Sequence, residues 1–377
     1  DKSLVRQDED SRGEVRFSML ETIREFGQEQ LAEAGETGAA RLHAAYFLAL
    51  AEEAEPALTG PDQEQWFERL DTEHDNLRAA LTWSLASDSP LATGLAARLG
   101  RFWYLRGYFT EGRRWLETAL ANDTSESTNR AAILYHLAGI AIFQGDHEQG
   151  SPWADEALRL YREGGHLSGT AMALNVLGVI ASHVEDFDRA DILLKESLDL
   201  HRQGRDERNV AITLGNLAWL AAMRQQEEEA QAYTEESLAL ARRMGDSAGI
   251  AYALQNLGRI AFEHGDISRA ADAFIEGLTL AWEIGAPLDM TECLEGLAVV
   301  TAARGKPEQA ARMFGAAAES RIRINLPVPP SDRPVYEKHL AFARYQVDEA
   351  TWALAWGAGC RLSLGEAVSE ALQAVVV

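Results

Sequence analysis

The sequence is poor in cysteine and in positive charge. Its 377 residues include two cysteines, Cys293 and Cys360, and both lie in apolar helical contexts. A disulfide framework is therefore excluded, and a reducing cytoplasm is the expected compartment. The chain has 35 Lys and Arg residues against 59 Asp and Glu residues, which gives a formal net charge of -24. Because proteins bind nucleic acid by neutralising its phosphates with basic side chains, we expect no direct nucleic-acid contact.

Long apolar runs and catalytic motifs are also missing. No stretch reaches the roughly 18 apolar residues that span a bilayer, and no leader opens the chain, so no membrane segment is expected. The patterns G-x-x-x-x-G-K-[ST] and G-x-S-x-G do not occur, and His147-Glu148 lacks the second histidine of a zinc-protease helix. A triad of scattered Ser, His and Asp side chains stays open, but no motif indicates one. The sequence predicts no catalytic residue, no metal site and no cofactor, so we expect a protein that is not an enzyme.

An internal repeat dominates the rest of the sequence. Residues 129–326 repeat five times with a step of forty residues, and residues 91–128 show the same pattern with a slightly shorter step. One column is always leucine, and it consists of Leu137, Leu177, Leu217, Leu257 and Leu297. Each unit has two apolar patterns of helical period that are separated by a turn signal and followed by a glycine such as Gly204. This strict period predicts a stacked array of helical hairpins.

The second repeat shows the column pattern most completely. Its residues Leu177, Gly178, Ala190, Leu194 and Ser197-Leu198 resemble the tetratricopeptide repeat. The common form of that repeat has about 34 residues, so a forty-residue step implies longer helices or longer turns. A HEAT-type helical repeat has a similar period and is the alternative. We expect an all-α fold, a right-handed tetratricopeptide-repeat superhelix (α-solenoid), with a short β-hairpin at the N-terminus.

The first residues follow a different pattern. Two strand-like segments flank a polar connection and predict the β-hairpin, and an amphipathic helix that ends at Gly35 follows. The segments that carry a second resemblance are Asp1-Lys-Ser-Leu-Val5, Arg16-Phe-Ser-Met-Leu-Glu-Thr-Ile-Arg-Glu-Phe26, His43-Ala-Ala-Tyr-Phe47 and Glu73-His-Asp-Asn-Leu-Arg-Ala-Ala-Leu81. They resemble the junction between a winged-helix module and a tetratricopeptide sensor in bacterial signal-transduction ATPases, including large LuxR-type transcriptional regulators. The resemblance implies that the chain begins inside the wing and that a nucleotide-binding switch domain lies upstream in the full-length protein. An unrelated two-stranded lid is the alternative.

These patterns divide the chain into four parts. They are a winged-helix remnant (1–38), a leading helical hairpin (39–90), the repeats with a 38- and then a 40-residue period (91–326), and a Pro-rich loop with a C-terminal helical cap (327–377). The leading hairpin is expected to pair a helix over 39–55 with one long helix that runs from Trp66 to Leu85. Four prolines exclude a helix directly after Leu326, and the last of three short helices opens with the capping box Ser363-x-x-Glu366.

Function in such an array is expected on the concave wall, which one face of each first helix lines. The predicted ligand- or partner-binding residues on and beside this face are Arg101, Tyr104, Tyr135, His136, Asn175, Asn216, Trp219, Tyr252, Gln255, Asn256, Arg259, Phe262 and Glu263. Aromatic rings provide contact area, and amide side chains can pair with a peptide backbone or a sugar. For Asn216 and Asn256, a structural bond to the neighbouring hairpin is the alternative.

Arg259 is the only basic residue on the inner face of the last four repeats, and it should lie level with Trp219. A guanidinium beside an indole can bind a carboxylate, a phosphate or a peptide carbonyl. An internal salt bridge from Arg259 to Glu263 or Glu295 is the competing explanation.

The resemblance implies a function as the sensor or protein-interaction region of a signal-transduction ATPase that regulates transcription. A small effector or a partner protein would bind in the concave groove and would shift the upstream switch domain between a closed and an assembly-competent state. A constitutive scaffold that binds a protein segment without an inducer is the alternative.

Overall fold

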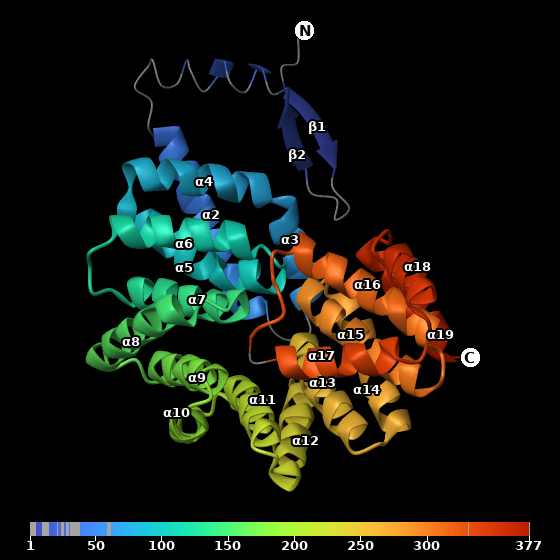
Figure 1. Ribbon diagram of the computed structural model, residues 1–377. Coiled ribbons are helices and arrows are strands. Elements are labelled where there is room, and N and C mark those ends of the chain that lie inside the picture. The colour runs from blue at the N-terminus through green and yellow to red at the C-terminus, as the bar shows by residue number, and fades with distance from the viewer. Residues whose placement is uncertain are drawn as a thin grey trace.

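The computed structural model describes residues 5–9, 15–20, 22–23, 26–27, 30, 38–58, 62–330 and 332–376, and nearly all of them are helical (Figure 1). The predicted N-terminal hairpin is present: β1 (Val5–Glu9) pairs antiparallel with β2 (Val15–Met19), and Val5 lies opposite Met19. The predicted helix that ends at Gly35 falls largely outside the described residues. The fold is therefore a helical array with a two-stranded hairpin before it.

Three helices lead into the array. They are α2 (Gly38–Ala57), α3 (Gln63–Thr72) and α4 (His74–Ser87). The prediction of one long helix after residue 62 is wrong, because the chain bends at Glu73 between α3 and α4. The bend allows the next residue, His74, to pack its ring 4.6 Å from that of Tyr108 and 5.6 Å from that of Phe102. Tertiary packing has overridden a continuous apolar pattern here.

Six hairpins follow, each with an inner and an outer helix. The inner helices are α5 (Ser89–Leu105), α7 (Thr128–Gln144), α9 (Leu167–His183), α11 (Glu207–Met223), α13 (Ser247–Glu263) and α15 (Pro287–Ala303). The outer helices are α6 (Phe109–Asn122), α8 (His147–Glu163), α10 (Phe187–Gln203), α12 (Glu227–Met244), α14 (Ile267–Glu283) and α16 (Pro307–Arg323). In the second repeat both helices have 17 residues and the turns have three, so the forty-residue step reflects long helices.

One residue in each turn of the forty-residue repeats has a positive φ angle, and these residues recur every twenty positions. The turn residue with positive φ is Gly145, Glu185, Gln225, Gly265 or Gly305 after an inner helix, and Gly165, Arg205, Gly245, Gly285 or Asn325 after an outer helix. Its φ lies between 53° and 78°, the left-handed region that favours glycine. Asp often follows and caps the next helix, as when Asp186 accepts a hydrogen bond from the backbone N–H of Arg189. In the second repeat Gly204 follows the helix as predicted, but Arg205 adopts the left-handed conformation.

A first prediction concerns these turns. Gly165→Ala should lower the free energy of unfolding by about 1 kcal/mol, because an alanine strains this backbone conformation. No atom lies within 4 Å of an added Cβ there, so the loss would come from the backbone alone. Glu185→Gly should instead raise it by about 0.5 kcal/mol. Urea denaturation of both variants checks the pair, and equal effects of the same sign would contradict it.

Small residues recur every forty residues at the positions of Gly178 and Ser197, where the two helices of a hairpin cross. A Cβ on Gly178 would lie 2.7 Å from the Cγ of Leu194, so only glycine permits this approach between α9 and α10. Ser197 uses its small side chain differently, because its buried hydroxyl donates to the carbonyl of Ala171 at 2.7 Å. These contacts explain why small residues recur at the positions of Gly178 and Ser197 in the other repeats.

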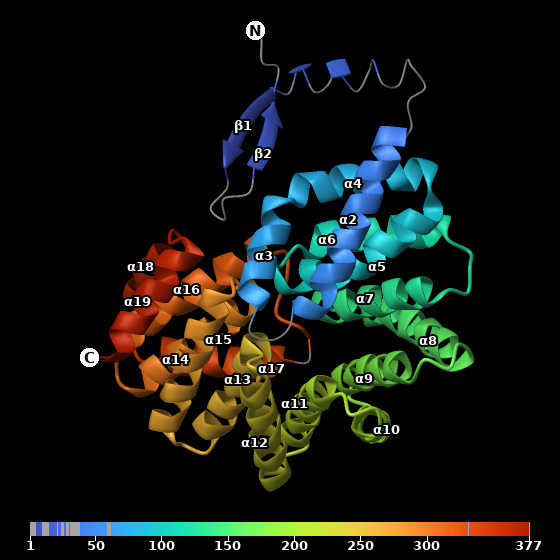
Figure 2. The ribbon, with the colours of Figure 1, turned by 180° about the vertical axis from the view of Figure 1, so that it is seen from behind.

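The array curls until its beginning meets its end (Figure 2). Arg106, just after α5, donates to the carbonyl oxygens of Ile284 at 3.0 Å and Gly285 at 2.8 Å, in the turn before α15. Its guanidinium also pairs with Asp71. Leu105 packs beside Ala248, from the start of α13. The concave side is therefore enclosed between hairpins that lie about 180 positions apart in the sequence.

The C-terminal part forms three helices, α17 (Arg333–Arg344), α18 (Glu349–Gly359) and α19 (Leu364–Val376). The predicted capping box is present, since Ser363 Oγ accepts from the backbone N–H of Glu366 at 3.2 Å while the Glu366 carboxylate accepts from that of Ser363 at 2.8 Å. Helices α18 and α19 pack on α16 and end the array, whereas α17 crosses its concave side (Figure 1). Within the described residues, no helix is both long and apolar enough to cross a membrane.

Candidate functional site

Two adjoining cavities occupy the concave side. The larger, of about 490 Å³, lies among α5, α7, α9, α11 and α13, and the smaller, of about 250 Å³, lies between α9, α11, α13, α15 and α17. The wall that they share is formed by Ile142, Phe143, Val179, Asn216 and Tyr252. Their size and largely apolar lining with a few polar groups are typical of ligand sites.

Twelve of the thirteen predicted residues line these cavities. The larger cavity contains Arg101, Tyr104, Tyr135, His136, Asn175, Asn216 and Tyr252. The smaller contains Asn216, Trp219, Tyr252, Gln255, Asn256, Arg259 and Phe262. Glu263 lines neither, because it turns toward α17 and accepts from Lys338 at 2.8 Å and His339 at 2.9 Å. A ligand role for these residues remains a prediction.

A chain of hydrogen bonds crosses three inner helices at the junction of the cavities. The Asn216 amide donates to the side-chain oxygen of Asn175 at 3.0 Å, and its own oxygen accepts from the Tyr252 hydroxyl at 2.8 Å. Asn216 thus makes the bonds to neighbouring hairpins that the structural alternative required. Asn256 differs, because its Nδ2 is buried and has no acceptor in hydrogen-bond geometry among the described residues, although it lies close enough to the Tyr252 hydroxyl to interact with it. An unpaired buried donor of this kind is costly unless another molecule supplies the acceptor.

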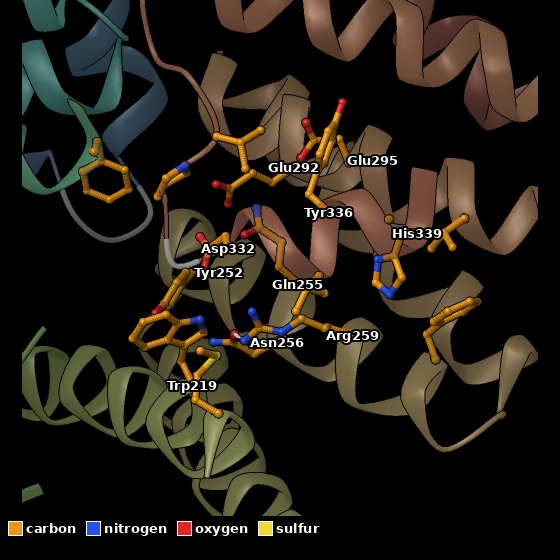
Figure 3. Close-up of a pocket in the computed structure, with 18 of the residues that line it drawn as sticks. Trp219, Tyr252, Gln255, Asn256, Arg259, Glu292, Glu295, Asp332, Tyr336 and His339 are labelled. Atoms are coloured by element: carbon orange, nitrogen blue, oxygen red, sulfur yellow. Dashed lines mark hydrogen bonds between the residues drawn. The ribbon is translucent and has the colours of Figure 1, made fainter. Parts of the chain in front are cut away.

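Arg259 lies in the smaller cavity, beside Asn256 and Gln255 (Figure 3). Its guanidinium donates to Asn256 Oδ1 at 3.0 Å. It forms no ion pair with any described carboxylate, since Glu263 bonds α17 and Glu295 forms a two-pronged pair with Arg321 at 2.7 and 2.8 Å. The competing salt bridge is therefore absent from the described residues.

The indole of Trp219 lines the same cavity, but it does not stack on Arg259. Its ring centroid lies 4.8 Å from that of His183, which in turn stacks at 5.1 Å on His147. Burial lowers the pKa of His183 to about 4, so this ring is neutral at pH 7. The Trp219 ring thus provides an apolar wall beside the cation rather than a direct clamp.

Sequence reasoning missed two sets of lining residues. The first set comes from the Pro-rich loop and α17, and it includes Val328, Pro329, Asp332, Tyr336 and His339. A loop rich in proline carries no repeat register, so its path across the groove could not be predicted. The second set, Arg208, Asp246 and Asp289, lies at the starts of inner helices. The sequence marks each of these residues only as a charged side chain just before an apolar helical pattern. Such a charge is also usual at an ordinary helix start, so it did not indicate a site.

The wall contributed by α15 carries acidic groups. Burial raises the pKa of Asp289 to about 6, although a hydrogen bond from Gln255 at 3.3 Å opposes the rise. Burial also raises the pKa of Glu292 to about 8 against the attraction of Arg321, which lies 3.8 Å away. Glu292 is 33% exposed, and that part of the side chain lines the smaller cavity. At pH 7 Glu292 is therefore mostly protonated, whereas Asp289 is mostly ionised.

A second prediction follows for Glu292→Gln. Folded Glu292 keeps its proton up to about pH 8, whereas an unfolded glutamate loses it near 4.5, so its contribution to stability falls as pH rises through this window. The variant should melt at a higher temperature than the wild type at pH 8.5 and at the same temperature at pH 4.5. Exposed Glu228→Gln controls for the removal of one negative charge. A difference that does not depend on pH would contradict the prediction.

Metal-binding groups do not gather in the site. Among the residues that the structure describes, no three His, Cys, Asp or Glu side chains are placed to hold a metal ion. The ring of His136 packs against Gly100 in the larger cavity, and burial lowers its pKa to about 3. It lines the cavity as a neutral ring.

The chain is similar to known proteins in sequence and in fold. The family model described as "Tetratricopeptide repeat" matches residues 129–203 and 169–243, which confirms the repeat type. Proteins of Mycobacterium tuberculosis and Mycobacterium bovis named "Putative HTH-type transcriptional regulator" are 31% identical over 191 residues, which are 47% of this chain and 21% of each relative. The chain spans about a fifth of the length of these curated relatives.

Two solved structures share the fold. One is a Rap protein complexed with Competence and Sporulation Factor, with 14% identity and a TM-score of 0.52 over 82% of this chain and 99% of that one. The other is the Rap conjugation gene regulator of the plasmid pLS20 in complex with the Phr* peptide, with 12% identity and a TM-score of 0.52 over 80% and 94% of the two chains. The chain is thus an all-α tetratricopeptide solenoid, and about half of it is similar to part of a transcriptional regulator.

Proposed function

We propose that this chain is the sensor region of a signal-transduction ATPase that regulates transcription, and that a peptide segment is its effector. The observation that carries the proposal is the convergence of aromatic rings, amides and Arg259, which has no ion pair among the described residues, on two adjoining and partly enclosed cavities. Extended peptides need apolar surface for their side chains and amide partners for their backbone, and this groove supplies both. The comparisons support the class, because the similar regulators act in transcription by name and a Rap structure with this fold holds a peptide.

The mechanism would be a shift of conformational population. A segment bound between the first hairpin and α13 would contact the beginning and the later part of the array at once. It would therefore favour the conformation in which these two parts touch. An upstream nucleotide-binding switch domain would sense this change through the first hairpin. In this proposal the region is cytoplasmic, does no catalysis and makes no direct contact with nucleic acid or membrane.

Selection of peptides on the purified chain tests the proposal. Displayed twelve-residue peptides would be enriched on the wild type, and their affinities measured by fluorescence anisotropy. Trp219→Ala should weaken the best binders at least tenfold, because the indole lines the smaller cavity. Ile192→Ala, whose side chain is exposed on the outer helix α10, should leave them unchanged. A selection that yields only binders equally tight to Trp219→Ala would overturn the proposal.

A third prediction concerns Arg259→Ala with the same peptides. Because Arg259 bonds only Asn256 among the described residues, its removal should change the melting temperature by less than about 1 °C. Affinity should fall at least tenfold, since a charge-assisted hydrogen bond contributes about 1.5 to 3 kcal/mol. A lower melting temperature with unchanged affinity would assign Arg259 a structural role instead.

A further inference from the structure

Arg101, on α5, is a groove cation without a partner. Its Nε is buried and has no acceptor, and its guanidinium makes no hydrogen bond or ion pair with any described residue. The side chain lines the larger cavity beside Tyr104 and Tyr135. Arg98, one turn earlier on the same helix, is paired with Glu55 at 3.1 Å. Of these two neighbouring arginines, only the one that faces the cavity lacks a counter-ion.

A second arginine faces the same cavity with a free donor. Arg208, in the first turn of α11, places Nε 3.4 Å from Asp246 Oδ2, and its Nη2 is buried without an acceptor. Arg101 also lies within the electrostatic reach of Asp246. The curl of the array makes this convergence possible, because α5, α11 and the start of α13 come from three different hairpins.

The carboxylates around the cavity are already engaged. Asp246 accepts from the backbone N–H of Gly249 at 3.2 Å as a helix cap and from Arg208. Glu55 is paired with Arg98, and Asp289 accepts from Gln255. Among the described residues that line this cavity, the buried side-chain polar atoms without a partner are thus both guanidinium N–H donors, Arg101 Nε and Arg208 Nη2.

This arrangement is costly for the unliganded protein. A cation that is partly withdrawn from water without a hydrogen-bonding partner destabilises the folded state. Burial accordingly lowers the pKa of Arg101 from its usual value. Asp246 and Glu55 line the same cavity and attract Arg101 from a distance, but neither forms an ion pair with it, because each is bonded to another arginine. An acceptor for the Arg101 donors is therefore expected from a ligand.

We propose that the larger cavity is an anion subsite in which Arg101 and Arg208 bind a carboxylate or phosphate group of the groove ligand. The planar guanidinium presents donors in a fork that matches both anions. Tyr104 and Tyr135 flank the subsite and provide aromatic surface for the part of the ligand that carries the anion. This inference rests on the proposed function of the groove and names the chemistry of one end of its ligand.

The first test is the sign of a stability change. Arg101→Met removes the unpaired charge and keeps an apolar side chain of similar length, so the melting temperature should rise by about 2 °C or more. Arg269→Met, which breaks an exposed pair with Glu235, should change it by less than about 2 °C. A marked fall for Arg101→Met would show that Arg101 has a structural partner and would overturn the inference.

The second test uses sodium phosphate and sodium acetate, each against sodium chloride of equal ionic strength. Phosphate stabilises many proteins by exclusion from their surface, and this general effect should be equal in all variants. Bound anion should add a further rise of about 2 °C or more that is present in the wild type and Arg269→Met but lost in Arg101→Met and Arg208→Met. A larger rise with phosphate identifies a phosphate ligand, and a larger rise with acetate identifies a carboxylate.

Equal anion responses in all four proteins would overturn the inference. The titration needs no peptide, so its outcome is independent of the peptide selection. If peptides bind through Trp219 while the anion response is missing, the groove proposal stands and the subsite falls. If the anion response is present while no groove-dependent peptide is found, the subsite stands and the peptide proposal falls.

Discussion

Gly359→Ala is expected to cost about 3 kcal/mol of unfolding free energy, at the upper end of the usual range for overpacking. The last residue of α18 lies so close to α16 that an added Cβ would be 2.0 Å from the carbonyl oxygen of Arg312. The contact is reciprocal, because a Cβ on Gly315 of α16 would lie 2.3 Å from the carbonyl oxygen of Trp356. Backbone atoms cannot move aside as a flexible side chain can, so the two helices would have to separate.

Gly357→Ala is the matched control on the same helix. An added Cβ there meets only the Nη1 of Arg361, at 3.8 Å, which is an ordinary contact. Alanine favours a helix interior over glycine, so this variant should gain about 0.5 to 1 kcal/mol. Urea denaturation of both variants would show opposite shifts of the midpoint. Similar shifts would mean that α18 does not pack on α16 at Gly359.

The second large effect is expected for Arg106→Met, which should loosen the contact between the beginning and the end of the array. The substitution removes the pair with Asp71 and the two hydrogen bonds to the turn before α15. Hydrogen bonds to charged groups contribute about 1.5 to 3 kcal/mol each and are not additive, so a total loss of about 3 kcal/mol is expected. The two ends are also joined by Leu105, by Leu288 and Leu326, which pack into the core of the first helices, and by a hydrogen bond from Asn325 to Thr110 at 3.1 Å. Small-angle X-ray scattering should therefore show a modest increase of the radius of gyration.

Arg269→Met is the control for this variant, since its pair with Glu235 is exposed and contributes at most about 1 kcal/mol. Separation of the two ends of the array would also move Arg101 away from Asp246 and Arg208. Arg106→Met should therefore lose the specific response to anions. An unchanged radius of gyration together with unchanged stability would show that the stacking of hairpins alone sets the curvature.

Repetition explains why much of the fold could be predicted. The leucine column, the small residues at Gly178 and Ser197, and the turn signals recur every forty residues, so each helix and its inner face are defined several times over. A local pattern also determined the capping box at Ser363, because a helix cap depends on neighbours within one turn. The same regularity placed twelve of the thirteen predicted residues on the cavities.

The remaining features depend on contacts that no local pattern encodes. Glu263 belongs to the inner helix by spacing, yet it turns toward Lys338 of α17. The bend at Glu73 likewise follows from the packing of His74 on a later hairpin. In both places a residue distant in sequence supplied the partner, and the tertiary contact outweighed the local pattern.

The sequence by itself determined the repeat unit and the side of each inner helix that faces the groove, because these follow from period and from backbone preference at the turns. The structure decided that the forty-residue step comes from long helices and not from long turns. Only the tertiary structure decided how far the array curls, since a small rotation between hairpins accumulates over the whole chain. That curl brings Arg106 to the turn at Gly285 and Arg101 toward Asp246, and it turns an open concave wall into partly enclosed cavities. The tertiary structure also decided that the buried Nε of Arg101 has no hydrogen-bond acceptor among the described residues, because whether a donor finds a partner depends on every helix that surrounds it.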